Sequence, residues 1–188
     1  MEGYKVRLAV MGDAAGGKRT MFRTYQWDGK WEFTDDDELA GVFQGAMITK
    51  YEDVDGQNVT VQVWCMPTTG IFDRTAGSEF AHWTLAILLV FDLTSKSSFE
   101  RLDEWMSYFE KKVKINTPII LVGNKKDLVS ERQVSFKEAE KFALDYNLKY
   151  YEVSSKEGSS VLDMFTSIIV MLKQKVDSEI SDSSCDPK

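Results

Sequence analysis

The stretch Val10-Met11-Gly12-Asp13-Ala14-Ala15-Gly16-Gly17-Lys18-Arg19-Thr20 decides how this chain folds. Two of its glycines, Gly12 and Gly17, bracket four residues, and a lysine follows the second glycine. Glycine at each end lets the backbone curl so that successive N–H groups point at an anion, while the lysine reaches the outer phosphates of a nucleotide. The pattern predicts a phosphate-binding loop made of Asp13, Ala14, Ala15, Gly16, Gly17, Lys18, Arg19 and Thr20.

The residues on either side of this loop have the patterns of a strand and a helix. Apolar Val6, Leu8 and Val10 alternate with other residues, which is typical of the strand that leads into such a loop. Residues 21–25 are amphipathic and are expected to lie on the next helix, whose positive dipole end faces the anion. The alternative is a glycine-rich turn without a ligand. This interpretation holds only if no motif later in the chain indicates a nucleotide site.

Length and composition set the broad class. The chain has 188 residues, of which 43% are apolar and 28% charged, as expected for one domain with a buried core. We assign residues 1–176 to this domain and expect a polar, disordered tail over residues 177–188. No apolar run is long enough to cross a bilayer and no signal-peptide pattern opens the chain, so we expect a cytoplasmic protein. The net charge of −7 opposes binding to nucleic acid.

Metal-site and triad chemistry have few residues to use. The chain has two cysteines, Cys65 and Cys185, without a ligand spacing, and a single histidine, His82. We therefore expect no structural metal and no Ser-His-acid triad, and we assign His82 a structural or surface role.

Strands and helices alternate along the rest of the chain. Residues 46–54 and 59–64 are predicted to form a hairpin across Asp55-Gly56, a dipeptide that tolerates the positive φ of a tight turn. Buried strands are expected at 85–91, 118–122 and 150–153. Ser97 and Ser135, each followed three residues later by glutamate, are expected to begin helices, and 161–175 to close the fold. This order predicts an α/β fold with a mostly parallel six-stranded sheet, one antiparallel edge strand and helices on both faces.

Two polar motifs follow two of these strands. Asn124-Lys125-Lys126-Asp127 follows strand 118–122, at the strand end where parallel sheets bind ligands. An aspartate there can accept hydrogen bonds from the N1 and N2 donors of guanine, which adenine lacks. Ser154-Ser155-Lys156 follows strand 150–153 and offers backbone N–H groups to the guanine carbonyl oxygen. A solvated turn and a helix cap are the alternatives, but three such motifs at three strand ends favour a guanine nucleotide site.

These motifs resemble those of the Ras superfamily of small GTP-binding proteins, and the Rab branch in particular. The resemblance covers residues 4–175, and it includes the Rab-like segments 61–64 and 90–94. It implies a P-loop small G domain that binds GTP or GDP. It also implies that an aromatic residue stacks on the base, for which Trp31 is the first choice and Phe33 the second. The guanine-binding residues that it implies are Trp31, Asn124, Lys125, Asp127, Leu128, Ser154, Ser155 and Lys156.

The sequence departs from that family at the phosphate end. Arg19 stands where the family has the Ser or Thr that binds magnesium, and Thr20 comes one position late. The loop before the hairpin has no threonine at the metal-sensing place. After Trp64, the family's Asp-Thr-Ala-Gly-Gln is replaced by the segment 65–69, which begins with Cys65 and lacks the glutamine that orients water. A rival alignment places that motif at 73–80, with Ser78 in place of the glutamine.

Three functions follow from these departures. The first is a divergent Rab-like protein that binds guanine nucleotide, hydrolyses GTP slowly or not at all, and recruits effectors in membrane trafficking. Magnesium would then bind weakly or be dispensable, because Arg19 would supply positive charge. We therefore assign no metal-binding or catalytic residue. The others are an ordinary GTPase switch and a nucleotide-free scaffold. The expected partners are effectors and exchange or activating factors. Peripheral attachment to an intracellular membrane requires lipidation, and the end Cys185-Asp186-Pro187-Lys188 lacks the aliphatic prenylation pattern.

Overall fold

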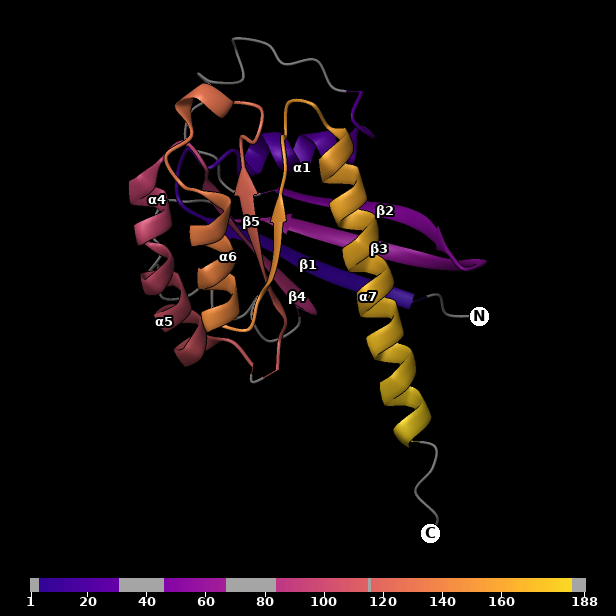
Figure 1. The fold of residues 1–188 in the computed structure, drawn as a ribbon. Helices are drawn as coiled ribbons and strands as arrows, with labels where there is room; N and C mark the ends of the chain where they lie inside the picture. The colour runs from indigo at the N-terminus through magenta and orange to yellow at the C-terminus, as the bar shows by residue number, and fades with distance from the viewer. Residues whose placement is uncertain (1–3, 31–45, 67–83, 115, 184–188) are drawn as a thin grey trace.

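Six strands form one sheet in the computed structural model of the chain, in the order β2-β3-β1-β4-β5-β6 (Figure 1). The structure describes residues 4–30, 46–66, 84–114 and 116–183. Within these ranges the β2–β3 pair is antiparallel and the other strand pairs are parallel, which confirms the predicted sheet. The strands are β1 (Tyr4–Gly12), β2 (Ala46–Val54), β3 (Gln57–Cys65), β4 (Ala86–Asp92), β5 (Ile119–Asn124) and β6 (Lys149–Glu152).

The hairpin between β2 and β3 turns at the predicted dipeptide. Asp55 has a φ of 54° and Gly56 a φ of 75°, the two positive values that a two-residue hairpin turn of the primed type requires. The strands pair from Val54 with Gln57 to Ala46 with Cys65, so β3 begins two residues before the predicted Val59. The longer register carries Cys65 beside Val10, at the end of the strand that leads into the phosphate-binding loop.

Helices cover both faces of the sheet, as predicted. Alternate residues of β4 enter two cores: Leu88 and Val90 pack with α1 and α7, and Ile87 and Leu89 pack with α5 and α6. All seven residues of β4 are buried, as in a strand that is covered on both sides. The helices are α1 (Lys18–Gln26), α4 (Lys96–Glu100), α5 (Leu102–Lys112), the short 3-10 helix η1 (Val129–Glu131), α6 (Phe136–Asp145) and α7 (Ser159–Ser183).

One predicted helix start is confirmed and one is wrong. Ser135 caps α6 in a full capping box with Glu138. Ser97, however, lies inside α4, and the cap is Ser95, whose side chain accepts a hydrogen bond from the Ser98 N–H over 3.3 Å. Ser95 takes this place because its backbone is extended, as an N-cap requires, whereas Ser97 is already helical.

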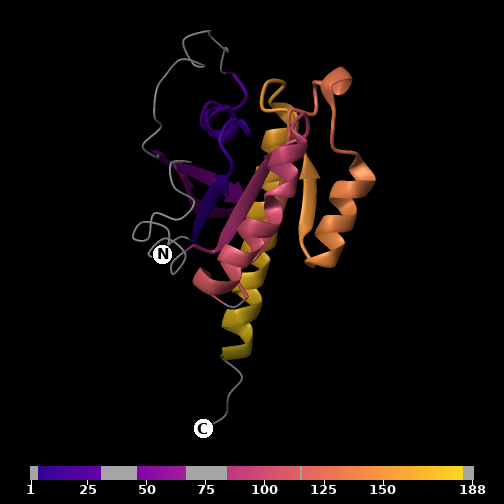
Figure 2. The same cartoon turned by 90° about the vertical axis from the view of Figure 1, so that its left-hand side faces the viewer.

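The closing helix is longer than predicted. Helix α7 continues to Ser183, so residues 177–183 are helical where we expected a disordered tail, and residues 184–188 lie outside the described part of the chain. The Tyr4 hydroxyl at the start of β1 donates to Asp177, and Lys173 binds the same carboxylate at 3.0 Å. Figures 1 and 2 show this end of α7 extending past the strands. Contacts with the first strand and the preceding helical turn therefore support residues that composition alone marks as tail.

Candidate functional site

The phosphate-binding loop joins β1 to α1 and packs tightly against its neighbours. A Cβ atom added to Gly12 would lie 2.0 Å from the Val90 carbonyl oxygen, and one added to Gly17 would lie 2.2 Å from Asn124 Nδ2. Gly17 also has a φ of 78° and is the N-cap of α1. Gly12 has a φ of 133°, so both glycines are required by space and by backbone conformation.

Asp13 anchors this loop to helix α5. Its side chain accepts a hydrogen bond from Trp105 Nε1 over 3.0 Å and forms an ion pair with Arg101 Nε at 3.2 Å. The next two residues, Ala14 and Ala15, are exposed, and Ala15 has a φ of 61°, in the region that favours glycine. The contacts of Asp13 hold the loop in place, a role that the sequence analysis did not assign.

Lys18 opens helix α1 with its side chain folded back over the loop. Its ammonium donates to the Asp13 carbonyl oxygen, and the residue is only 6% exposed. Burial lowers the pKa of Lys18 to about 8, against the opposing influence of Cys65 and Asp13. A phosphate beside this ammonium would supply a negative charge that offsets the loss of hydration on burial.

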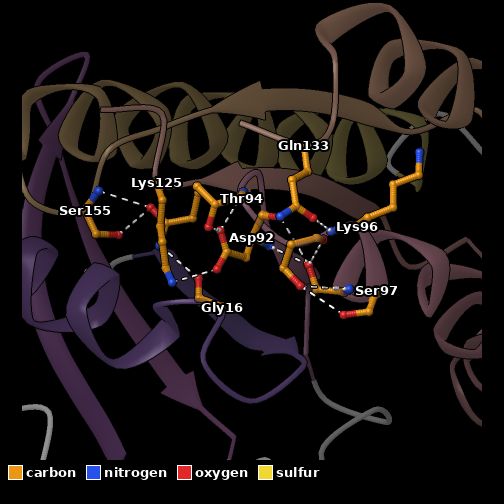
Figure 3. A network of polar contacts seen from close by, with 11 residues as sticks. Gly16, Asp92, Thr94, Lys96, Ser97, Lys125, Gln133 and Ser155 are labelled. Carbon is orange, nitrogen blue, oxygen red and sulfur yellow. Dashed lines mark hydrogen bonds and ion pairs between the residues drawn. The ribbon is translucent and has the colours of Figure 1, made fainter. Parts of the chain in front are cut away.

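Asn124 joins the phosphate-binding loop to the loop after β6. Its Nδ2 donates to the Gly16 carbonyl oxygen over 2.9 Å, while its Oδ1 accepts from the backbone N–H of Ser155 at 3.1 Å and from the Ser155 hydroxyl at 2.9 Å (Figure 3). Asn124 is 1% exposed, so these bonds form away from water. One side chain thus fixes two candidate binding loops relative to each other.

Lys125 is held by a carboxylate at the end of β4. Its ammonium lies 2.6 Å from Asp92 Oδ2, and the other oxygen of Asp92 accepts from the Thr94 N–H and hydroxyl at 2.8 and 2.6 Å (Figure 3). Lys125 has a φ of 65°, which turns the chain sharply after Asn124. The pairing directs the lysine stem across the strand ends.

Asp127 contacts the other predicted guanine motif directly. The Ser154 hydroxyl donates to Asp127 Oδ1 over 2.7 Å, and Leu128 N–H closes the turn onto the Lys125 carbonyl at 3.1 Å. Asp127 and Leu128 are half-buried and Lys156 is exposed. The sequence motifs after β5 and β6 therefore form one continuous surface.

The backbone donors of the second motif are partly used inside the protein. The N–H of Ser154 donates to Ser160 Oγ over 3.0 Å, and that of Ser155 donates to Asn124. Because the N–H groups of Ser154 and Ser155 are used in this way, the N–H of Lys156 is the best placed of the three to donate to a guanine carbonyl. Trp31, Phe33 and the rival motif 73–80 lie outside the described residues.

The phosphate end carries positive charge and a neutral thiol. Arg19 and Thr20 follow Lys18 in the first turn of α1, and both are half-buried. Cys65, 1% exposed, lies close enough to Lys18 and Arg19 for both charges to act on it, yet burial dominates and raises the thiol's pKa to about 12. The first turn of α1 holds no acidic residue.

Comparison with known proteins settles the family. A sequence model of the Ras family matches residues 7–174. This chain belongs to the Ras family. Among curated relatives, a Ras-related protein Rab-26 from Bos taurus is 33% identical over 178 residues, covering 92% of this chain and 66% of the relative. A Ras-related protein Rab-8A from Pongo abelii is 28% identical over 185 residues, covering 96% and 84%. The chain is thus a Rab-like member of the Ras family of small GTP-binding proteins.

The described residues of this Ras-family chain do not fit the magnesium ion that the family implies. In the alignment that we favour, the hydroxyl position is Arg19 and the aspartate position is Cys65, whose thiol has a pKa that burial raises. No group of three or more His, Cys, Asp or Glu in the described ranges is placed to hold a metal. The nearby carboxylates are engaged elsewhere, Asp13 by α5 and Asp92 by Lys125. In the same ranges no helix combines the length and apolarity that crossing a bilayer requires.

Proposed function

We propose that this chain binds GTP or GDP with little need for magnesium, hydrolyses GTP slowly or not at all, and acts by recruiting protein effectors. The single observation that carries the proposal is the contrast between the two ends of the site. At the guanine end, Asn124 holds the phosphate-binding loop and the loop after β6 together. At the phosphate end, Arg19 and the buried Cys65 stand where metal-assisted hydrolysis needs oxygen ligands.

The guanine end supports nucleotide binding. Asn124 holds the phosphate-binding loop and the Ser155 loop together, and Asp127 lies at hydrogen-bond distance from Ser154 with its half-buried carboxylate beside both motifs. The site residues that we propose here are those of the sequence analysis, with the Lys156 N–H as donor to the guanine carbonyl and Trp31 as stacking partner.

The phosphate end supports slow hydrolysis. Catalysis of phosphoryl transfer consists mainly of positioning and charge neutralisation by the metal and a held water. A protonated thiol at Cys65 offers neither a negative charge nor an oxygen atom to a magnesium ion. Losing such parts costs on the order of 4 kcal/mol of transition-state stabilisation, or about a thousandfold in rate.

The cellular part of the proposal rests on the family alone. Rab-like relatives support a role in intracellular membrane trafficking, with effectors and exchange or activating factors as partners. We propose a cytoplasmic protein that attaches peripherally to an intracellular membrane only where it is lipidated.

The first experiment extracts and identifies the nucleotide that copurifies with the full chain, and then measures GTP hydrolysis in a single turnover. Bound GTP, with a rate about a thousandfold below that of an ordinary Rab protein assayed in parallel, is the expected result. Bound GDP with rapid turnover would favour an ordinary switch instead. Failure of both GTP and GDP to bind in a direct titration would overturn the proposal in favour of a scaffold.

A further inference from the structure

Asp92 lies at the end of β4, directly beside the guanine motif. In the parallel register it stands opposite Asn124, and the N–H of Leu93 donates to the Asn124 carbonyl over 3.0 Å. Asp92 is 6% exposed, and its own N–H donates to Ser98 Oγ over 3.0 Å. This end of β4 is thus bonded to both β5 and α4, and it carries a buried carboxylate that is not one of the proposed nucleotide-binding residues.

The side chain of Asp92 holds Lys125 by charge and is itself held by Thr94. Its Oδ2 lies 2.6 Å from the Lys125 ammonium, while its Oδ1 accepts from the N–H and hydroxyl of Thr94 at 2.8 and 2.6 Å (Figure 3). Charged hydrogen bonds are short and strong, and the two Thr94 donors leave the carboxylate little freedom to turn. The position of the Lys125 ammonium is therefore set from β4.

Lys125 forms the turn that leads from β5 to Asp127. Its φ of 65° is a conformation that residues with a Cβ rarely adopt without support. Backbone hydrogen bonds supply part of that support: the Lys126 N–H donates to the Val153 carbonyl and the Leu128 N–H to the Lys125 carbonyl, both over 3.1 Å. The ion pair adds support through the side chain, so it helps to set where the following carboxylate lies.

Asp127 has one carboxylate oxygen available to a ligand. The Ser154 hydroxyl donates to Oδ1 over 2.7 Å, and Oδ2 has no partner among the residues that the structure describes. The carboxylate can accept from both N1–H and the 2-amino group of guanine only if it is aligned with both, because hydrogen bonds weaken steeply with misalignment. A small shift of the turn therefore lowers the preference for the 2-amino group before it abolishes nucleotide binding.

We propose that Asp92 is a positioning residue that sets the preference of this site for guanine over bases without a 2-amino group. The inference deepens the proposed function and rests on it. Asp92 acts through its neighbours: its ion pair with Lys125 fixes the turn, and the turn carries Asp127.

The test compares GTP with ITP, whose base differs from guanine only in lacking the 2-amino group. The ratio of their dissociation constants is measured by competition calorimetry on the full chain. The wild type is expected to prefer GTP by at least about tenfold, because ITP leaves a charged acceptor unpaired. Asp92→Asn places a neutral amide beside the Lys125 ammonium and is expected to reduce this preference about fivefold.

Two changes at Thr94 provide a second test should Asp92→Asn fail to fold. Thr94→Val removes the hydroxyl that donates to Asp92 and is expected to reduce the preference about two- to threefold. Thr94→Ser restores a hydroxyl and is expected to keep the wild-type ratio. An unchanged ratio in Asp92→Asn, or in Thr94→Val where Asp92→Asn does not fold, would overturn the role of Asp92.

Lys125→Met shows whether the effect passes through the ion pair. This change keeps the apolar stem and removes the ammonium, so it is expected to lower the ratio as well. Asp92→Asn and Lys125→Met combined are expected to lower it no further than the larger single change, because both break the same contact. Fully additive effects would overturn this route.

Glu152→Gln is the matched control, because it neutralises an equally buried carboxylate at the end of β6. The side chains of Glu152 and Asp92 are each 8% exposed, but Glu152 is paired with Arg132, outside the guanine motifs. We expect a lower free energy of unfolding in urea, as in Asp92→Asn, with a GTP to ITP ratio within about twofold of wild type. An equal loss of the ratio in both variants would overturn the specific role of Asp92.

The wild-type measurement separates failure of this inference from failure of the proposed function. Binding of GTP without preference over ITP would overturn the inference and leave nucleotide binding standing. No binding of GTP, GDP or ITP would overturn the proposed function itself, and this inference with it.

Discussion

Trp105 on α5 donates its indole N–H to the buried carboxylate of Asp13 over 3.0 Å, across 92 residues of sequence. Asp13 is 7% exposed and is also paired with Arg101 at 3.2 Å. A carboxylate in this environment is stable only when its oxygens are satisfied. The position of the phosphate-binding loop is thus coupled to a helix that itself contains none of the proposed nucleotide-binding residues.

Replacing Trp105 with Phe tests this coupling. The ring is largely kept, but one buried charged oxygen loses its donor, so we expect a loss of about 1–3 kcal/mol in the free energy of unfolding, measured in urea. Arg101→Gln is the control: its side chain is 47% exposed, and we expect a loss below about 1 kcal/mol. Equal losses in the two variants would show that the indole N–H has no special part.

Asn124→Ala tests the bridge between the two ends of the site. The Gly16 carbonyl and the Ser155 N–H would both lose a buried partner, and the two loops would no longer be fixed together. We expect GTP affinity to fall about a hundredfold, measured by calorimetry, which corresponds to about 3 kcal/mol.

Gln133→Ala is the matched control for that variant. Gln133 belongs to the polar network of Figure 3, but its side chain accepts an exposed hydrogen bond from the Lys96 N–H at 3.0 Å, away from the loops. We expect its affinity for GTP to stay within about twofold of wild type. An affinity of Asn124→Ala equal to that of Gln133→Ala would contradict the bridging role.

Local sequence patterns were sufficient for most of the fold. The turn at Asp55-Gly56 is predictable because few dipeptides accept two positive φ values in succession. The buried strand β4 is predictable because its residues are continuously apolar up to the last one. Ser95 was missed because the residue three positions after it is Ser98, whereas Ser97 has the glutamate of a capping box, Glu100, three positions later. The two candidate caps differ in backbone conformation, which the sequence does not reveal.

The candidate site was less predictable, because its contacts join distant parts of the chain. Motifs identified Asn124 and Asp127, but no local pattern indicates that Asp13 binds Trp105 or that the N–H of Ser155 is taken by Asn124. The extension of α7 was missed for the same reason. Residues 177–183 are polar except for Ile180, and the contact from Tyr4 to Asp177 comes from the opposite end of the chain.

Tyr4→Phe tests whether that contact supports the end of α7. The variant keeps the ring against the helix but removes the hydroxyl that donates to Asp177. We expect faster hydrogen exchange, by about two- to fivefold, in the last two turns of α7, because the variant removes a hydrogen bond that joins Asp177 to the first strand. Exchange elsewhere in α7 is the internal control, and unchanged rates in residues 177–183 would show that the contact is dispensable.

Lys18 makes nucleotide binding and stability depend on pH in opposite directions. Its pKa in the folded, nucleotide-free protein is about 8, below the ordinary value of 10.5, because burial disfavours the charged form. Between these values the unfolded chain holds a proton that the folded chain has lost. The stability of the nucleotide-free protein therefore gains a contribution from Lys18 as pH rises from about 8 to about 10.5.

Nucleotide binding has the opposite sign, because phosphate oxygens favour the charged ammonium and binding above pH 8 must take up a proton. We expect GTP affinity to fall by up to about tenfold per pH unit above pH 8, with proton uptake visible as a dependence of the calorimetric enthalpy on buffer ionisation. Lys18→Met is the control: it should bind weakly at every pH and lack both slopes. An affinity that is flat from pH 8 to 9 in the wild type would contradict the shifted pKa of Lys18, because binding would then take up no proton.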